Sequence, residues 1–169
     1  MTRRTTGALV LGAVCLSLVA FVPAQGQDNP GESEVQRGFD IAPVPLVLKG
    51  KSRSLVGLGS YYVNGTSDCY GCHSGPNGYL SGGNQFGPVF SRNLTPDAFG
   101  RPGGLTFEEF EQVMRFGTDF KNVAPPGPLI VMPWPAYRHG TGRFVKAIYE
   151  YLTTIPCIEG GPGIPANRC

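Results

Sequence analysis

The sequence predicts an all-α fold, with three or more helices joined by long loops rich in glycine and proline. Three stretches of the chain place apolar residues at helical spacing. Between the first two stretches, residues 74–104 are dense in Gly, Pro, Asn and Ser, and no regular element of useful length fits there. The length of 169 residues predicts one domain, or one domain with a tail.

Residues 1–24 are expected to be a secretory signal peptide. Two arginines precede a charge-free apolar run over residues 8–22, and Val22-Pro23-Ala24 supplies small residues at the −3 and −1 positions of a cleavage site. Two alternatives remain open. Cys15 could be a lipoprotein cysteine, but the large valine before it disfavours this. The segment could also remain as an uncleaved anchor, but its apolar run is shorter than the roughly 20 residues that span a bilayer.

The chain that remains after cleavage is expected to be close to neutral. Loss of Arg3 and Arg4 lowers Lys+Arg from 14 to 12, which equals the 12 Asp+Glu. A nucleic-acid partner is not expected from this balance. Lys49, Lys51 and Arg53 could form a local basic patch or belong to a solvated linker.

Residues 25–54 are expected to be a flexible N-terminal arm, with a short extended piece at 44–48, because they lack apolar periodicity. The first helix follows and ends at Gly65. Its apolar positions are Leu55, Val56, Leu58, Tyr61, Tyr62 and Val63. Gly59 lies among them and costs a helix about 1 kcal/mol relative to Ala. We therefore expect another helix to cross closely at Gly59.

A capping box begins the second helix, in which Thr106 bonds the amide of Glu109 and the glutamate side chain reaches back. This helix should end at Phe116, with Gly117 as its stop. Its inward residues are Phe107, Phe110, Val113 and Met114. Proline at 125, 126 and 128 forbids helix before Leu129. The inner face of the last helix, which ends near residue 154, contains Phe144, Ala147, Ile148, Tyr151 and Leu152.

The first helix leads into Cys69-Tyr70-Gly71-Cys72-His73, which is the spacing of a c-type haem attachment site. Cys69 and Cys72 share a helix face, so both sulfurs can add to the vinyl groups of one porphyrin. His73 is then placed to bind iron as the proximal ligand. We expect a backbone carbonyl to accept a hydrogen bond from its other ring nitrogen. One covalent haem c is predicted, with the loops wrapped around it.

Two other uses of the cysteine pair remain open. Cys69 and Cys72 could be half of a zinc site, but the further candidates His139, Cys157 and Cys169 have no paired spacing. A thiol–disulfide redox motif expects a βαβ context, which the flanking residues do not supply.

Residues 157–169 are expected to be a C-terminal tail closed by a disulfide. Removal of the leader takes away Cys15 and leaves four cysteines, of which two are assigned to the haem. Cys157 and Cys169 can pair in an oxidising compartment, and the alternative is two free thiols.

The chain from about residue 55 to 156 resembles the small c-type cytochromes of the class I fold, and most closely those that serve bacterial periplasmic dehydrogenases. The resemblance rests on the haem motif and three further segments in order. These are Ser91-Arg92-Asn93-Leu94-Thr95-Pro96-Asp97, Met132-Pro133-Trp134 and Ile148-Tyr149-Glu150-Tyr151-Leu152. It implies a cytochrome c domain over 55–156, and the arm and the tail lie outside the shared pattern.

The resemblance also implies thioethers at Cys69 and Cys72 and iron ligation by His73 and Met132. Met114 is expected to fill the core instead, because it lies in an amphipathic helix. His139 is the competitor of Met132 as sixth ligand, and an open sixth position is the other alternative. Asn93, Trp134 and Arg138 are expected either to touch the haem or to serve ordinary loop packing.

An iron with two protein ligands has no site for substrate, so the expected function is electron transfer and not catalysis. We expect a periplasmic carrier or the electron-accepting subunit of a dehydrogenase complex. A dehydrogenase and a terminal oxidase or another cytochrome are the expected redox partners, with no stable membrane span after signal cleavage. The alternative is a haem enzyme or gas sensor whose sixth position is open or displaceable.

Overall fold

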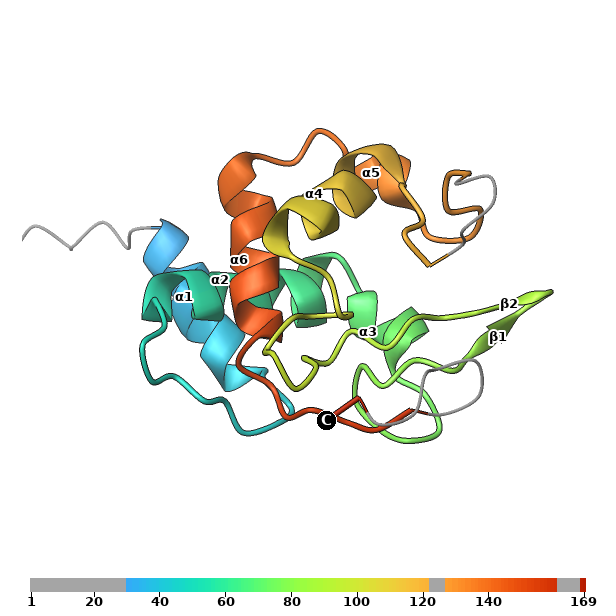
Figure 1. Ribbon diagram of the computed structural model, residues 1–169. Helices are drawn as coiled ribbons and strands as arrows, with labels where there is room; N and C mark the ends of the chain where they lie inside the picture. The colour runs from blue at the N-terminus through green and yellow to red at the C-terminus, as the bar shows by residue number, and fades with distance from the viewer. Residues whose placement is uncertain (1–29, 122–126, 161–167) are drawn as a thin grey trace, which may run out of the picture.

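The computed structural model describes residues 30–121, 127–160 and 168–169 of the chain, so the expected signal peptide and Cys15 lie outside the described residues. This part is rich in helix and has few strands, in agreement with the all-α expectation (Figure 1). Its longer helices are α1 (Pro30–Asp40), α2 (Arg53–Tyr61), α4 (Phe107–Phe116) and α6 (Gly142–Leu152). The shorter elements are the π-helix η1 (Tyr62–Thr66), α3 (Cys69–His73), β1 (Gln85–Phe86), β2 (Val89–Phe90) and α5 (Trp134–Tyr137).

The prediction of a flexible arm over residues 25–54 is wrong for its first part, because Pro30–Asp40 forms helix α1. This helix packs on α2 (Figure 1). A Cβ atom on Gly38 would lie only 1.8 Å from the carbonyl oxygen of Gly57, so glycine allows the two backbones to touch. The Ser60 hydroxyl also donates a hydrogen bond to the Gly38 carbonyl at 2.6 Å. Gly38 is therefore the residue that lets α1 pack on α2.

The rest of the arm connects α1 to α2 along the core. Val44, Leu46 and Leu48 pack against the core, whereas Val47 between them is exposed, as expected for an extended piece. The amide of Val47 donates to the carbonyl oxygen of Thr154 at 2.9 Å, which joins this segment to the end of α6.

Helix α6 crosses α2 at Gly59, which confirms the close crossing expected from the sequence. A Cβ atom on Gly59 would lie 1.9 Å from the carbonyl oxygen of Ala147. The main core cluster lies around this crossing and against α4. Its buried members are Val56, Val63, Leu80, Phe110, Met114, Val145, Ile148, Tyr151, Leu152 and Ile155.

The ends of α4 and α6 follow the local sequence. Thr106 and Glu109 form the expected capping box of α4, and Gly117 ends the helix with φ of 69°. Thr141 caps α6 by accepting a hydrogen bond from the amide of Phe144. Met114 is buried in the core, which confirms its expected role.

The tail is closed by a disulfide between Cys157 and Cys169, as expected. Closing a loop of this length stabilises a fold by about 2–4 kcal/mol. Among the residues that the structure describes, no helix is both long enough and apolar enough to cross a bilayer.

We predict that Gly59→Ala destabilises the protein by about 1–3 kcal/mol, because the added methyl group would force α2 and α6 apart. Urea unfolding monitored by circular dichroism measures the change. Gly142→Ala is the matched control, since a Cβ atom at Gly142 meets nothing within 4 Å. Equal stability of the two variants would contradict the close crossing.

Candidate haem site

The attachment motif forms helix α3 and follows a strained residue. Asp68 precedes the helix with a left-handed φ of 46°. A Cβ atom on Gly71 would lie 2.7 Å from a carboxylate oxygen of Asp68, so a larger residue there would have to displace that side chain. Cys69 is partly buried, Cys72 is exposed, and both are free thiols. Two sulfurs are therefore presented from one helical turn.

The His73 ring is oriented by a backbone carbonyl, as the sequence led us to expect. Its Nδ1 lies 2.7 Å from the carbonyl oxygen of Arg92, which can only accept a hydrogen bond. Nδ1 therefore carries the proton and Nε2 keeps a lone pair that a metal can take. Burial lowers the pKa of His73, against the opposing effect of the Arg92 carbonyl, so the ring is neutral at neutral pH.

The thiol of Cys69 differs from the thiol of a disulfide oxidoreductase. Burial, with a further contribution from the Asp68 carboxylate, raises its pKa to about 12. Reactive cysteines in such enzymes have lowered pKa values, because the thiolate is the nucleophile. As for the zinc alternative, the described residues contain no group of three or more His, Cys, Asp or Glu side chains that could hold a metal ion.

Met132 lies on the loop that leads into α5. The amide of Trp134 donates to the Met132 carbonyl at 2.8 Å, which makes a tight turn at Pro133. The Met132 side chain is partly buried against the core, and so is Cys69. The Tyr137 hydroxyl, at the other end of α5, donates to the carbonyl of Ser67 at 3.0 Å. The structure thus joins the methionine segment to the chain just before the haem motif.

The same loop is anchored to the end of α4. The amide of Leu129 donates to the Gly117 carbonyl at 2.7 Å, and Trp134 Nε1 donates to the Leu129 carbonyl at 3.1 Å. The indole of Trp134 lies so close to Gly117 that a Cβ atom there would be 2.4 Å from Nε1. Arg138 stacks over this indole at 5.5 Å. Trp134 and Arg138 thus fasten this loop to the end of α4.

The two remaining candidate residues are His139 and Asn93. His139 is exposed on the turn between α5 and α6. Asn93 is buried, and its side chain bonds Thr95 and the carbonyl of Ile158. Of the two roles expected for Asn93, the structure shows loop packing.

The sequence did not predict a network of side-chain hydrogen bonds that lies beside the motif. Tyr79 donates to Asn64 Oδ1 at 2.6 Å, and its oxygen lies 2.8 Å from the Tyr151 hydroxyl. Asn64 Nδ2 in turn lies 3.1 Å from both Ser60 Oγ and the Tyr151 hydroxyl. Burial raises the pKa of Tyr79, so its phenol stays protonated and donates. This network ties the loop after the motif to η1 and α6.

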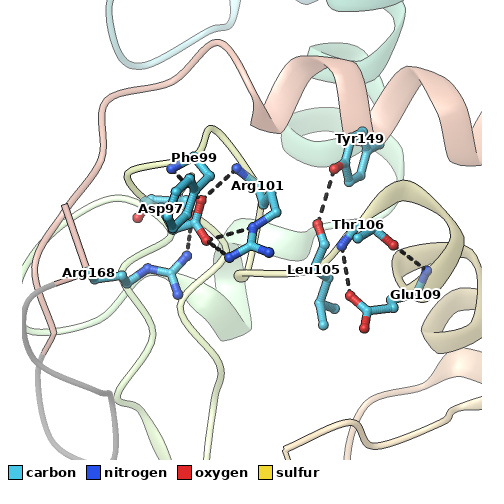
Figure 2. A network of polar contacts seen from close by, with 9 residues as sticks. Asp97, Phe99, Arg101, Leu105, Thr106, Glu109, Tyr149 and Arg168 are labelled. Atoms are coloured by element: carbon cyan, nitrogen blue, oxygen red, sulfur yellow. Dashed lines mark hydrogen bonds and ion pairs between the residues drawn. The ribbon is translucent and has the colours of Figure 1, made fainter.

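A second network holds the loop that follows Thr95 (Figure 2). The Asp97 carboxylate accepts hydrogen bonds from the amides of Phe99 and Arg101, both at 2.9 Å, and pairs with the Arg101 guanidinium at 2.9 Å. Farther along, Tyr149 of α6 donates to the Leu105 carbonyl at 3.1 Å, next to the capping box. The loop between residues 97 and 106 is therefore fastened at both ends.

The donor set of α3 fits a haem. Two free thiols on one helical turn match two vinyl groups, and the carbonyl-bound imidazole leaves Nε2 for iron.

Comparison with known proteins finds similarity to cytochrome c subunits of bacterial dehydrogenases. No protein-family model matches the chain. The chain is 32% identical over 102 residues to the fructose dehydrogenase cytochrome subunit of Gluconobacter japonicus, covering 56% of this chain and 20% of that protein. It is 31% identical over 98 residues to the cytochrome c subunit of the quinone alcohol dehydrogenase of Komagataeibacter europaeus, covering 54% and 20%. It is also 31% identical over 106 residues to the gluconate 2-dehydrogenase cytochrome c subunit of Pantoea cypripedii, covering 59% and 23%.

The chain spans about a fifth of the length of these relatives. It is thus similar to part of the cytochrome c subunits of bacterial dehydrogenases.

We predict that Asp97→Asn destabilises the protein by about 1–2 kcal/mol at neutral pH, because it removes the ion pair with the partly exposed Arg101 and weakens the hydrogen bonds from the Phe99 and Arg101 amides. Partial burial raises the pKa of Asp97, but hydrogen bonds from Arg101 and Phe99 outweigh this and lower it overall. The charged carboxylate therefore stabilises the fold above the unfolded-state pKa of about 3.9, and the effect is lost as the pH falls through the lower folded-state pKa.

Urea unfolding between neutral and acid pH should show the wild type and Asp97→Asn converging at low pH. Asp40→Asn, at an exposed position in α1, is the control and should track the wild type throughout. A constant difference between wild type and Asp97→Asn at every pH would contradict the assignment.

Proposed function

We propose that the protein is a mono-haem c-type cytochrome that transfers electrons and is not itself an enzyme. The haem is attached at Cys69 and Cys72, with His73 and Met132 as its axial ligands. The observation that carries the proposal is the histidine of a C-x-x-C-H helix held by a backbone carbonyl, with 2.7 Å between Nδ1 and the Arg92 oxygen. Similarity to cytochrome c subunits supports the same function.

The chain would tune electron transfer through the orientation and solvation of the site. A bound haem c supplies an iron that cycles between two oxidation states. The Arg92 carbonyl holds the His73 ring in one tautomer and one orientation, which makes Nε2 a more basic ligand. Apolar side chains packed around Cys69 and Met132 limit the access of water. A site whose ligands are held in place reorganises little when the charge changes.

Met132 is the better candidate for the sixth ligand than His139. The methionine side chain is partly buried against the same core as Cys69. Its loop is held at Pro133 by the turn to Trp134. His139 is exposed on a turn that follows α5. A thioether on a loop that is anchored to the core and to the end of α4 can be held toward iron without moving a helix.

The proposed location is the bacterial periplasm. Residues 1–24 would direct export as a signal peptide and then be cleaved. The Cys157–Cys169 disulfide fits an oxidising compartment. The printed names of the relatives favour a dehydrogenase as electron donor. A terminal oxidase or another cytochrome is the proposed acceptor.

The full chain expressed in a bacterium with a c-type maturation system should yield a red protein with one haem per chain in a pyridine haemochrome assay. Cys69→Ser with Cys72→Ser should abolish covalent attachment. Cys157→Ser with Cys169→Ser is the control, because it removes two cysteines outside the motif and should leave the haem in place. A colourless wild type with two thiols open to alkylation would refute the function.

Met132→Ala should open the sixth position, so that the reduced variant binds CO and the oxidised form loses the methionine-to-iron absorption band. Met114→Leu is the control, since Met114 is buried in the core and should keep both properties of the wild type. Ready CO binding by the wild type itself would favour the haem enzyme or gas sensor instead.

A further inference from the structure

The C-terminal tail contacts the segment that orients His73. The disulfide joins the first and last residues of the tail, and the described parts beside it are residues 158–160 and residue 168. Of these, Ile158 and Arg168 bond residues 93–98, which directly follow Arg92, whereas the carbonyls of Glu159 and Gly160 accept from Asn77. The tail therefore reaches the proximal side of the candidate site although it lies far from the motif in sequence.

Five hydrogen bonds join the tail to this segment, the longest from Thr95 Oγ1 to the Ile158 carbonyl at 3.5 Å. Asn93 Nδ2 donates to the Ile158 carbonyl at 2.9 Å, and the Ile158 amide donates to Thr95 Oγ1 at 3.1 Å. The Ala98 amide donates to the Arg168 carbonyl at 2.9 Å, and the Arg168 guanidinium donates to the Thr95 carbonyl. Figure 2 shows the Arg168 side chain beside Asp97. Because Ile158 and Arg168 both lie within the disulfide loop, the tail holds the segment from two points.

The two side chains that residues 93–98 contribute to this contact are buried, so their bonds are made within the protein. Asn93 is 3% exposed and Thr95 is 0% exposed. Asn93 Oδ1 also accepts from the Thr95 amide at 2.8 Å and from its hydroxyl at 2.7 Å. Without the tail, Asn93 Nδ2 and Thr95 Oγ1 would each lose a buried partner, which is costly.

The position of Asn93 determines the direction of the Arg92 carbonyl, because the two belong to one planar peptide group. Gly82 closes the other side of this peptide, since a Cβ atom there would lie 2.5 Å from the Asn93 nitrogen. The Gly82 amide in turn donates to the His73 carbonyl at 2.6 Å. The carbonyl that binds His73 Nδ1 is thus held between the loop after the motif and the tail.

We propose that the disulfide-closed tail is a positioning device for His73, which acts through Thr95, Asn93 and the Arg92 carbonyl and sets the reduction potential of the haem. The inference rests on the function proposed above. A strong hydrogen bond from Nδ1 makes the imidazole more basic and stabilises the oxidised iron. Loosening the tail weakens this bond, so the reduction potential rises.

The test compares three threonine variants of the holoprotein by redox titration. Thr95→Val removes the hydroxyl that bonds Ile158 and should raise the reduction potential. Thr95→Ser keeps the hydroxyl and should restore the wild-type value. Thr154→Val is the matched control, because Thr154 is equally buried but its hydroxyl bonds the Tyr151 carbonyl. Equal shifts in Thr95→Val and Thr154→Val, or no shift in either, would overturn the proposal.

A second readout follows the hydrogen bond itself. The Nδ1 proton of His73, observed by nuclear magnetic resonance in the reduced holoprotein, should exchange with solvent several-fold faster in Thr95→Val than in the wild type and Thr154→Val. Cys157→Ser with Cys169→Ser should show the same faster exchange and a raised potential, and it tests the tail if Thr95→Val fails to fold. Unchanged exchange and potential in this double variant would show that the disulfide has no positioning role.

The two proposals fail in different ways. A wild type without haem refutes the cytochrome and this inference together. A red protein whose potential and proton exchange do not respond to the tail refutes the positioning role and leaves the cytochrome intact.

Discussion

The hydrogen bond between His73 and the Arg92 carbonyl is the constraint on which the proposed site depends. It requires the chain to leave the motif helix, form a long loop and return to within 2.7 Å of the ring. Apart from the short β1–β2 pair, the loop meets this requirement by individual contacts, such as the hydrogen bond from the Gly82 amide to the His73 carbonyl. A ring held in this way presents Nε2 in one direction, as a metal ligand must.

Close helix crossings supply the rigid frame behind this loop. Gly59 lets α2 touch α6, and Gly38 lets α1 touch α2, each at a distance that a side chain would prevent. The polar chain from Ser60 through Asn64 to Tyr79 then connects this frame to the loop after the motif. The electron-transfer proposal needs such a frame, because a site that shifts with each change of charge transfers electrons slowly.

The helices α2, α4 and α6 could be predicted because their signals are local. A capping box, a terminal glycine and a repeated apolar spacing all act within a few residues. Helix α1 was missed for the opposite reason. Its packing face includes Gly38, whose role appears only when Gly57 of another helix lies against it.

By itself the sequence determined the attachment motif, the histidine beside it, the cysteine pair of the tail and the crossing at Gly59, since each depends on residue type and short spacing. Only the tertiary structure decided that Arg92 supplies the carbonyl, that Asn93 and Thr95 bond the tail, and that Trp134 packs on Gly117. These contacts join residues 17 to 65 positions apart. Such partners are selected by the packing of the whole chain, and no local pattern carries that information.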